Sequence, residues 1–461
     1  MSYEAFVREK LAYRAPSGIA GSVDLPSSLF PHQRALTAWA IKRGRAAIFA
    51  DTGLGKTSME LAWADVVTKH TGLPVMILAP LAVAAQTAAE GKRIGIDVAV
   101  CRDGADVRPG VNVTNYDRLH RFDPVMFGGV VLDESSIIKH HDARTFSALT
   151  EAFRETPFRL PATATPAPND WTEFGTHAEF LGICTRAEML AEFFTHDGGD
   201  TSVWRLKGHA RQQFWRWVCS WGALIRKPSD LGFDDAAYAL PRLHIHEHQI
   251  EVDGPMNGML FAAEAQTLSE RREARRASLE QRVAECAQKV NAEAGEPWVV
   301  WCDLNDESTA LVKAIDGAIE IRGSDDVDTK EERLRAFAEG KARVLVSKPS
   351  ICGHGLNWQH AARMAFVGVT DSYEAYYQAV RRCWRFGQKR EVHVHIFASK
   401  AEGAVVANLK RKERDAGDMA DALSAETRDA VMREVTGSHR ETNNYNADQR
   451  VQVPAWLRSA A

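Results

Sequence analysis

Short apolar runs rich in β-branched residues alternate with helix-like segments, and this pattern occurs twice along the chain. Such alternation predicts parallel strands, because a parallel connection needs a crossover that a helix usually supplies. We therefore expect an α/β fold with two parallel sheets, each covered by helices. The first sheet is predicted from Ala46–Ala50, Val75–Ala79, Asp97–Val100, Val111–Thr114, Val130–Asp133 and Phe158–Pro161. The second is predicted from Trp298–Cys302, Ala318–Ile321, Arg343–Ser347, Met364–Val367 and Val392–Phe397.

The length also favours two units. A single hydrophobic core stops growing at roughly 250–300 residues, whereas this chain has 461. We expect these segments: an N-terminal extension (1–23), a first lobe (24–170), a mainly helical, tryptophan-rich insertion (171–250), a connecting helix (251–295), a second lobe (296–415) and a polar tail (416–461).

Composition narrows the class of protein. Hydrophobic residues make up 45% of the chain and charged residues 26%, which is typical of a soluble globular protein. No stretch approaches the roughly 18 apolar residues of a membrane span, so we expect a cytoplasmic protein without a membrane partner. The net charge of −4 argues against a protein that is basic all over, although a basic cleft remains compatible with nucleic acid. The seven cysteines lack the spacing of a zinc site.

A glycine-rich loop follows the first predicted strand and opens a helix. The loop consists of Asp51, Thr52, Gly53, Leu54, Gly55, Lys56 and Thr57. In this context its backbone N–H groups can surround a phosphate at a helix N-terminus. Lys56 adds positive charge at the β- and γ-phosphates of ATP, and the Thr57 hydroxyl can ligate Mg²⁺. The alternative is an ordinary strand-to-helix turn.

Two carboxylates end another predicted strand. The apolar run Val130–Leu132 leads directly into Asp133 and Glu134. Buried carboxylates at a strand end are costly unless they have a function. We expect Asp133 to hold Mg²⁺ and Glu134 to orient and deprotonate an attacking water. A solvated turn after the strand is the alternative.

Two arginines lie three residues apart in the second unit. Arg382 and Arg385 are one helical turn apart and therefore point the same way. Guanidinium groups brought across a cleft can stabilise charge on the departing γ-phosphate of ATP. A solvated basic helix is the alternative for an isolated arginine-rich run.

Together these residues resemble helicase superfamily 2, most closely the Swi/Snf-type DNA translocases, from about Leu29 to Phe397. The resemblance implies two RecA-like lobes, ATP and Mg²⁺ as cofactors, and nucleic acid as partner. Gln33, in Phe30-Pro31-His32-Gln33, corresponds to the glutamine that contacts adenine, and residues 51–57 correspond to motif I. Asp133-Glu134-Ser135-Ser136 resembles the Asp-Glu-Ala-His box, with serine at its last two positions.

The resemblance extends to the motifs that couple hydrolysis to movement. Thr163 and Thr165, with Asn169 after them, correspond to motif III. Ser347 and residues 353–357, including Gly355 at the nucleotide, correspond to motif V, although His354 stands where glycine is frequent. Residues 378–388 correspond to motif VI: Gln378 has a coupling role, Arg382 and Arg385 are retained, and Arg381 replaces the aspartate usual in the Swi/Snf branch. Pro80, Thr114 and Asn115 occupy positions that touch the nucleic-acid backbone.

The resemblance favours a duplex-DNA translocase in a compact bacterial or phage version. A strand-separating DNA or RNA helicase is the first alternative, but no pattern identifies a wedge. A non-hydrolysing clamp or scaffold, or a restriction or modification subunit, are further alternatives. Trp215 and Arg216 offer stacking and phosphate contacts in the insertion, although such tryptophans are more often buried. The insertion or tail is also a candidate surface for a protein partner.

The alternating residues His244, His246 and His248 imitate a metal cluster on one side of a strand. No acidic or cysteine residue lies beside them with ligand spacing. We therefore expect no metal at these histidines.

Overall fold

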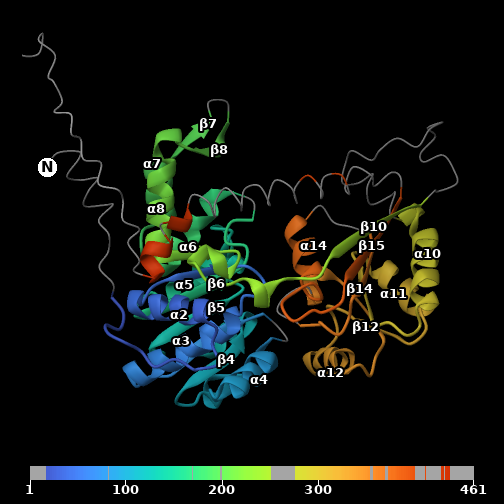
Figure 1. The fold of residues 1–461 in the computed structure, drawn as a ribbon, viewed down its shortest axis with the longest axis horizontal. Coiled ribbons are helices and arrows are strands. Elements are labelled where there is room, and N and C mark those ends of the chain that lie inside the picture. The colour runs from blue at the N-terminus through green and yellow to red at the C-terminus, as the bar shows by residue number, and fades with distance from the viewer. Residues whose placement is uncertain are drawn as a thin grey trace, which may run out of the picture.

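The computed structural model describes residues 17–80, 83–168, 170–197, 200–250, 276–352, 357–368 and 372–399, with 407, 411, 427–429 and 431–436. Two α/β lobes lie side by side, each a parallel sheet with helices on its faces (Figure 1). This arrangement confirms the predicted fold of two RecA-like lobes. No helix within these ranges is long and apolar enough to cross a membrane.

The first lobe contains a seven-stranded sheet in the order β3-β4-β2-β5-β6-β1-β9, with every neighbouring pair parallel. The strands are β1 (Ala47–Ala50), β2 (Val75–Ala79), β3 (Val98–Val100), β4 (Val111–Asn115), β5 (Gly129–Asp133), β6 (Phe158–Thr163) and β9 (Gly222–Ile225). The helices are α2 (Pro31–Arg43), α3 (Lys56–Thr71), α4 (Ala84–Ile94), α5 (Arg144–Ala152), α6 (Phe174–Leu181), α7 (Arg186–Phe193) and α8 (Arg211–Trp221).

The second lobe contains a six-stranded parallel sheet in the order β10-β15-β14-β11-β13-β12. The strands are β10 (Leu243–Ile250), β11 (Trp298–Cys302), β12 (Ala318–Ile321), β13 (Val344–Ser347), β14 (Arg363–Val367) and β15 (Val392–Ser399). The helices are α10 (Leu279–Ala292), α11 (Asn305–Ala314), α12 (Val327–Ala338), α13 (Pro349–Cys352) and α14 (Tyr373–Val380). Apolar clusters cover both faces of the sheet, as expected where helices shield parallel strands.

The segment between the sheets contains more strand than the sequence predicts. β9 pairs with β1 and extends the first sheet, and β10 forms the edge of the second sheet. β7 (Phe194–Asp197) and β8 (Asp200–Leu206) form an antiparallel hairpin that extends away from the sheet beside α7 (Figure 1). Residues 171–250 therefore contain four strands in addition to the helices α6, α7 and α8. β9 escaped prediction because its four apolar residues follow the apolar face of α8 without a polar break.

The described part of the C-terminal segment packs on the first lobe. Val431 is buried in the core of that lobe, and Glu434 forms an ion pair with Arg43 on α2. Arg428 donates a hydrogen bond to the carbonyl of Ser229 at 2.9 Å. The chain therefore returns to the first lobe after the second lobe. The predicted connecting helix is described from residue 276 onward, and its earlier part lies outside the described residues.

Candidate functional site

The Asp51–Thr57 loop joins the carboxyl end of β1 to the first turn of α3. Gly53 and Gly55 have φ angles of 93° and 81°, which favour glycine. Neighbouring atoms would also crowd a larger residue: a Cβ at Gly55 would lie 2.1 Å from Gln33 Nε2, and one at Gly53 would lie 3.1 Å from the backbone nitrogen of Phe386. The loop therefore exposes the N-terminus of α3 between the two lobes, where the helix dipole favours an anion.

Lys56 is the first residue of α3, and its side chain is largely buried. Its Nζ donates a hydrogen bond to the carbonyl of Ala50 at 3.0 Å. The lysine side chain thus folds back over the loop, and Thr57 follows it at a half-buried position. Both predicted residues lie where the loop meets the helix.

Asp133 and Glu134 lie at the carboxyl end of β5. Burial raises the pKa of Asp133 to about 7, with repulsion from Glu134 as the next cause and Lys56 opposing. Glu134 has a φ of 54°, the one positive value among the described non-glycine residues. Such a conformation costs of order 1–3 kcal/mol and persists where the surrounding structure enforces it. The two carboxylates are therefore held together in a way that is unfavourable without a positive charge.

Thr163 at the end of β6 contacts this acidic pair. Its hydroxyl donates to Glu134 Oε2 at 3.5 Å and accepts a hydrogen bond from the backbone N–H of Thr165 at 3.1 Å. Thr163 and Thr165 were predicted to couple hydrolysis to movement. The structure connects both of them to the carboxylate of Glu134.

Glu60 is an acid at this site that sequence reasoning missed. It is fully buried on α3, and neither carboxyl oxygen has a hydrogen-bond partner. Burial raises the pKa of Glu60 well above its usual range, with repulsion from Asp133 as the next cause. Its position one helical turn after Lys56 was the available signal, because residues i and i+4 share a helix face.

Arg382 and Arg385 extend from the second lobe toward the carboxylates of the first. Burial lowers the pKa of Arg382 to about 10, Arg385 lowers it further, and Glu134 and Asp133 raise it. Burial also lowers the pKa of Arg385, and its largest opposing cause is Glu134. Arg382 Nε is held by the carbonyl of Gln378 at 2.9 Å. The predicted arginines and carboxylates therefore form one electrostatic site across the cleft.

Gln33 lies against the Asp51–Thr57 loop and contacts it at Leu54. Its Nε2 donates to the carbonyl of Leu54 at 3.0 Å, and its Oε1 accepts the backbone N–H of Phe30 at 3.0 Å. Tyr238, from the segment between the lobes, stacks near Phe386 of the second lobe with centroids 4.7 Å apart, and Phe30 lies 5.5 Å from Tyr238. These aromatic rings were not predicted, because only the folded chain brings the three segments together.

The third residue of the acidic motif also has an unpredicted partner. Ser135 Oγ lies 3.1 Å from Nε2 of His177 on α6, and both side chains are fully buried. Burial lowers the pKa of His177 to about 4, so the ring is neutral at neutral pH. The serine that replaces the usual residue is thus fixed to the helix that follows β6.

The predicted nucleic-acid residues have different environments. Thr114 is 1% exposed and its hydroxyl donates to the carbonyl of Cys101 at 2.8 Å, while Asn115 is 8% exposed. Trp215 is 2% exposed and packs edge-on against Phe214, so it is a core residue and not a base-stacking surface. Its neighbour Arg216 is exposed, and Pro80 is half-buried.

Some predicted positions cannot be placed. Gly355 and Asn169 lie outside the described residues. Gln378 is described: it is 4% exposed, and its Oε1 has no hydrogen-bond partner. The coupling role of Gln378 stays a prediction.

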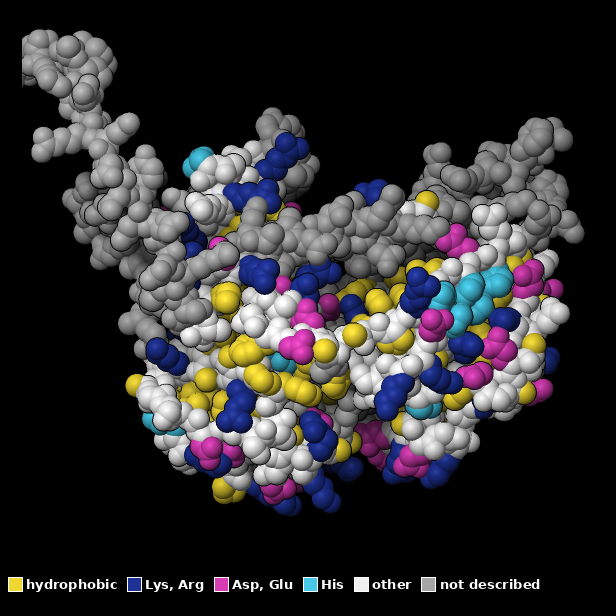
Figure 2. Space-filling model, in the orientation of Figure 1, with side chains coloured by type: hydrophobic (Ala, Val, Ile, Leu, Met, Phe, Trp, Pro, Cys, Tyr) yellow, Lys and Arg dark blue, Asp and Glu magenta, His cyan; other side chains and the backbone are white. Residues whose placement is uncertain are grey.

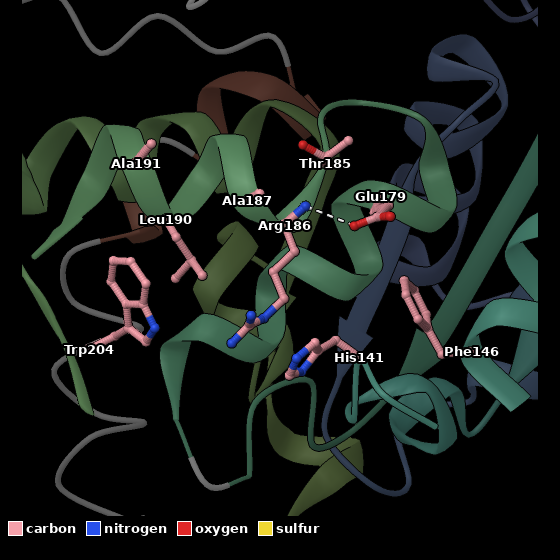
Figure 3. A pocket seen from close by; sticks show the side chains of 9 residues that line it. All are labelled: His141, Phe146, Glu179, Thr185, Arg186, Ala187, Leu190, Ala191 and Trp204. Carbon is pink, nitrogen blue, oxygen red and sulfur yellow. Dashed lines mark hydrogen bonds between the residues drawn. The ribbon is translucent and has the colours of Figure 1, made fainter. Parts of the chain in front are cut away.

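A separate pocket of about 400 Å³ lies in the first lobe, beside α6, α7 and the hairpin (Figure 3). The backbone N–H of Arg186 donates to Glu179 Oε2 at 2.8 Å at its rim. The pocket is lined by His141, Phe146, Glu179, Thr185, Arg186, Ala187, Leu190, Ala191 and Trp204. None of these nine residues belongs to the predicted motifs, so the pocket is distinct from the cleft site.

A match to a known protein family covers part of the second lobe. Residues 282–387 match the family model "Helicase conserved C-terminal domain". The search of curated proteins gave no match. Among solved structures, the chain is similar to the Sulfolobus solfataricus SWI2/SNF2 ATPase core in complex with dsDNA, with 16% sequence identity and a TM-score of 0.42 over 90% of this chain and 98% of that chain. The matched residues lie in the second lobe, so the chain contains a helicase conserved C-terminal domain there.

Proposed function

We propose that the protein is an ATP-dependent nucleic-acid motor that steps along duplex DNA. Burial lowers the pKa of Arg382 and Arg385, from one lobe, and the charge of Glu134, from the other lobe, opposes this shift; this electrostatic interaction carries the proposal. A site divided in this way is complete only when the lobes are close together. Hydrolysis in such a site can therefore alternate closing and opening of the cleft.

The residues present suit Mg²⁺ and a nucleotide. The hydroxyl of Thr57 and the carboxylate of Asp133 are the hard oxygen ligands that Mg²⁺ prefers. A cation there would also offset the burial and the repulsion from Glu134 that together raise the pKa of Asp133. When bound, the ion would neutralise charge on the phosphates. Lys56 and the N-terminus of α3 would hold the nucleotide.

Each remaining residue has a defined task in the proposed reaction. Glu134 orients the attacking water and accepts its proton, while Thr163 holds the Glu134 carboxylate. Arg382 and Arg385 stabilise the charge that develops on the γ-phosphate. Because Thr163 ends β6 and begins the segment toward Thr165, a change at Glu134 can be transmitted to the rest of the first lobe.

A strand-separating helicase is the second candidate. The observation that favours it is the β7–β8 hairpin, which extends from the first lobe beside α7 (Figure 1). A hairpin in this position is the kind of element that can divide two strands as a motor advances. The hairpin therefore supplies a candidate wedge that the sequence did not reveal.

The deciding experiment measures ATP hydrolysis by the purified full chain with duplex DNA, single-stranded DNA, RNA or no nucleic acid, at low and moderate salt. Duplex-specific stimulation supports the translocase, and stimulation by single strands alone supports the helicase. Lys56→Ala should abolish hydrolysis in every condition. If no nucleic acid changes the rate, the motor proposal fails; if Lys56→Ala retains full turnover, the assignment of the loop fails.

The helicase alternative has its own test. A displacement assay on a forked DNA duplex would compare the intact protein with a variant in which a short glycine-serine turn replaces the hairpin. Loss of displacement with unchanged DNA-stimulated ATP hydrolysis would support the hairpin as a wedge. Absence of displacement by the intact protein would favour the translocase.

A further inference from the structure

A patch of histidines covers part of the second lobe, over the paired strands β10 and β15 (Figure 2). The strands are parallel and in register, with His244 opposite His393 and His246 opposite His395. Alternate residues of a strand point to the same face, so histidines from both strands gather on one surface. His248 completes the patch on β10.

One end of the patch brings three metal-binding side chains together. His244, Glu391 and His393 each offer a ligand atom, and these atoms all lie within 4.8 Å of one another. Nε2 of His244 is 3.0 Å from Oε2 of Glu391. The His244 and Glu391 side chains are 34% and 57% exposed, so an ion can reach them from solvent.

The neighbouring histidines orient the ligands. Nε2 of His246 lies 3.0 Å from Nδ1 of His393, so at least one of these two rings must be neutral to accept the hydrogen bond. That bond fixes the orientation of the His393 ring. The His244 and His393 rings stack with centroids 4.7 Å apart, which further limits their orientations. Supporting hydrogen bonds and fixed rings of this kind are typical around metal-binding histidines.

The nearby positive charges have partners of their own. Two positively charged side chains, Lys289 and Arg363, lie near the histidines of the patch and interact electrostatically with His246. Glu293 binds both of them, Lys289 at 2.7 Å and Arg363 at 3.0 Å. The cations beside the patch are thus paired with an acid that is not one of the three ligands.

We propose that His244, Glu391 and His393 bind a divalent transition-metal ion, with Zn²⁺ as the best candidate. Two imidazoles and one carboxylate are a ligand set that suits Zn²⁺, whereas Mg²⁺ and Ca²⁺ prefer oxygen ligands alone. The ion joins β10, the edge strand that enters the second lobe from the first, to β15 inside the sheet. The bound ion therefore stabilises the pairing of β10, the strand that connects the lobes, with β15.

This inference differs from the expectation of a metal-free patch. The sequence shows no acidic partner beside His244, because Glu391 lies 147 residues later. Only the pairing of β10 with β15 brings the carboxylate to the histidines.

The test is calorimetric titration of Zn²⁺ into the full chain, prepared without a polyhistidine tag and stripped with a chelator. We expect one site, at least about tenfold weaker binding in His244→Ala and Glu391→Gln, and a higher melting temperature with Zn²⁺ in the intact protein only. His248→Asn is the matched control, because it changes the same strand and patch but no ligand. Asp133→Asn should leave Zn²⁺ binding unchanged, which separates this site from the cleft.

Two results would overturn the proposal. One is the absence of a Zn²⁺ site in the intact protein. The other is equal affinity in the intact protein, His244→Ala and Glu391→Gln, provided that the metal-free variants melt within a few degrees of the intact protein. If a variant does not fold, an absorption edge and anomalous scattering from a Zn²⁺-soaked crystal of the intact protein locate the ion. Its absence from these three residues would also reject the proposal.

Discussion

The hydroxyl of Tyr377, on α14 of the second lobe, donates a hydrogen bond to Oδ1 of Asp51, in the Asp51–Thr57 loop of the first lobe, at 2.6 Å. Arg381, one turn further along the chain, reaches Oδ2 of the same carboxylate at 3.4 Å. Asp51 Oδ1 also accepts the backbone N–H of Thr52 at 2.6 Å. One side chain of the loop thus joins the two lobes.

The ion pair with Asp51 gives a physical reason for an arginine at position 381. Arg381 stands where the Swi/Snf-type sequences that this chain resembles usually have aspartate. An aspartate at this position would repel Asp51, whereas arginine attracts it. The arginine is further held over the ring of Trp384, 4.6 Å from its centroid. Arg381 therefore favours approach of the lobes, independently of Arg382 and Arg385.

The first prediction concerns this contact between the lobes. Tyr377→Phe removes a hydrogen bond to a carboxylate, worth about 1 kcal/mol or more, and should shift the nucleotide-free protein toward a more open arrangement. Small-angle X-ray scattering would show a larger radius of gyration. Tyr116→Phe is the control, because it removes a hydroxyl that bonds within the first lobe, to the carbonyl of Asp133. Identical scattering from Tyr377→Phe and the intact protein would reject the prediction.

The second prediction concerns the arginines of the cleft. Arg385→Ala should lower kcat by roughly 10³-fold while changing ATP affinity only a few-fold, because the proposed contact strengthens in the transition state. Arg390→Ala, which removes an exposed arginine paired with Glu296 in the same lobe, should change neither quantity. Turnover and nucleotide binding must be measured separately. Unchanged kcat in Arg385→Ala would end its proposed role.

The third prediction separates two adjacent residues of α8. Trp215→Ala should lower the free energy of unfolding by about 3–5 kcal/mol, because Trp215 is buried among aromatic rings. Arg216→Ala should change stability by no more than about 0.5 kcal/mol, because its side chain is exposed. If Arg216 contacts phosphate, its loss should weaken DNA binding. It should also reduce the slope of the logarithm of the binding constant against the logarithm of salt concentration by about 1. Full stability of Trp215→Ala would contradict the core position.

Strands that the sequence predicts are those whose apolar run is bounded by proline, glycine or polar residues. β2 and β11 were predicted at their observed bounds, because each is followed by a break in the apolar run. The residues of the Asp51–Thr57 loop could be identified from the sequence equally well, since their spacing is local. The second sheet was predicted by the same signal, and the helicase domain match confirms its class.

Features that depend on contacts distant in sequence could not be predicted. The Ser135–His177 pair joins a turn to a helix 42 residues later, and no local pattern marks it. Glu391 reaches His244 only through strand pairing. Trp215 was a candidate for base stacking, but it is buried. The local sequence could not decide this, because an aromatic residue beside an arginine has the same local sequence whether it is buried or exposed.

The fourth prediction follows from the pKa of His177, which burial lowers to about 4. Between pH 6.5 and pH 4 the unfolded chain binds a proton at this ring and the folded chain does not. Stability is therefore lost as the pH falls through this window, by up to roughly 3 kcal/mol from this residue. Unfolding of the intact protein and of His177→Asn should be compared at several pH values, since other histidines also titrate. Parallel stability curves would contradict the prediction.

The last prediction concerns a buried ion pair in the second lobe. Arg282 on α10 and Glu307 on α11 approach with an N···O distance of 2.8 Å, and both side chains are 0% exposed. Glu307→Gln should cost about 3–5 kcal/mol, because it leaves the Arg282 charge buried without its acid. Lys341→Ala, which breaks an exposed pair with Glu339, should cost less than about 1 kcal/mol.

A double variant tests the cause of that loss. Arg282→Leu combined with Glu307→Gln removes the unpaired charge, while the amide oxygen of the glutamine can still accept the backbone N–H groups of Asp303 and Leu304, which Glu307 binds at 2.9 Å. The double variant should therefore be more stable than Glu307→Gln alone, as measured by denaturant unfolding. If the double variant is less stable than either single variant, packing of the arginine side chain, and not its charge, determines the stability of this helix pair.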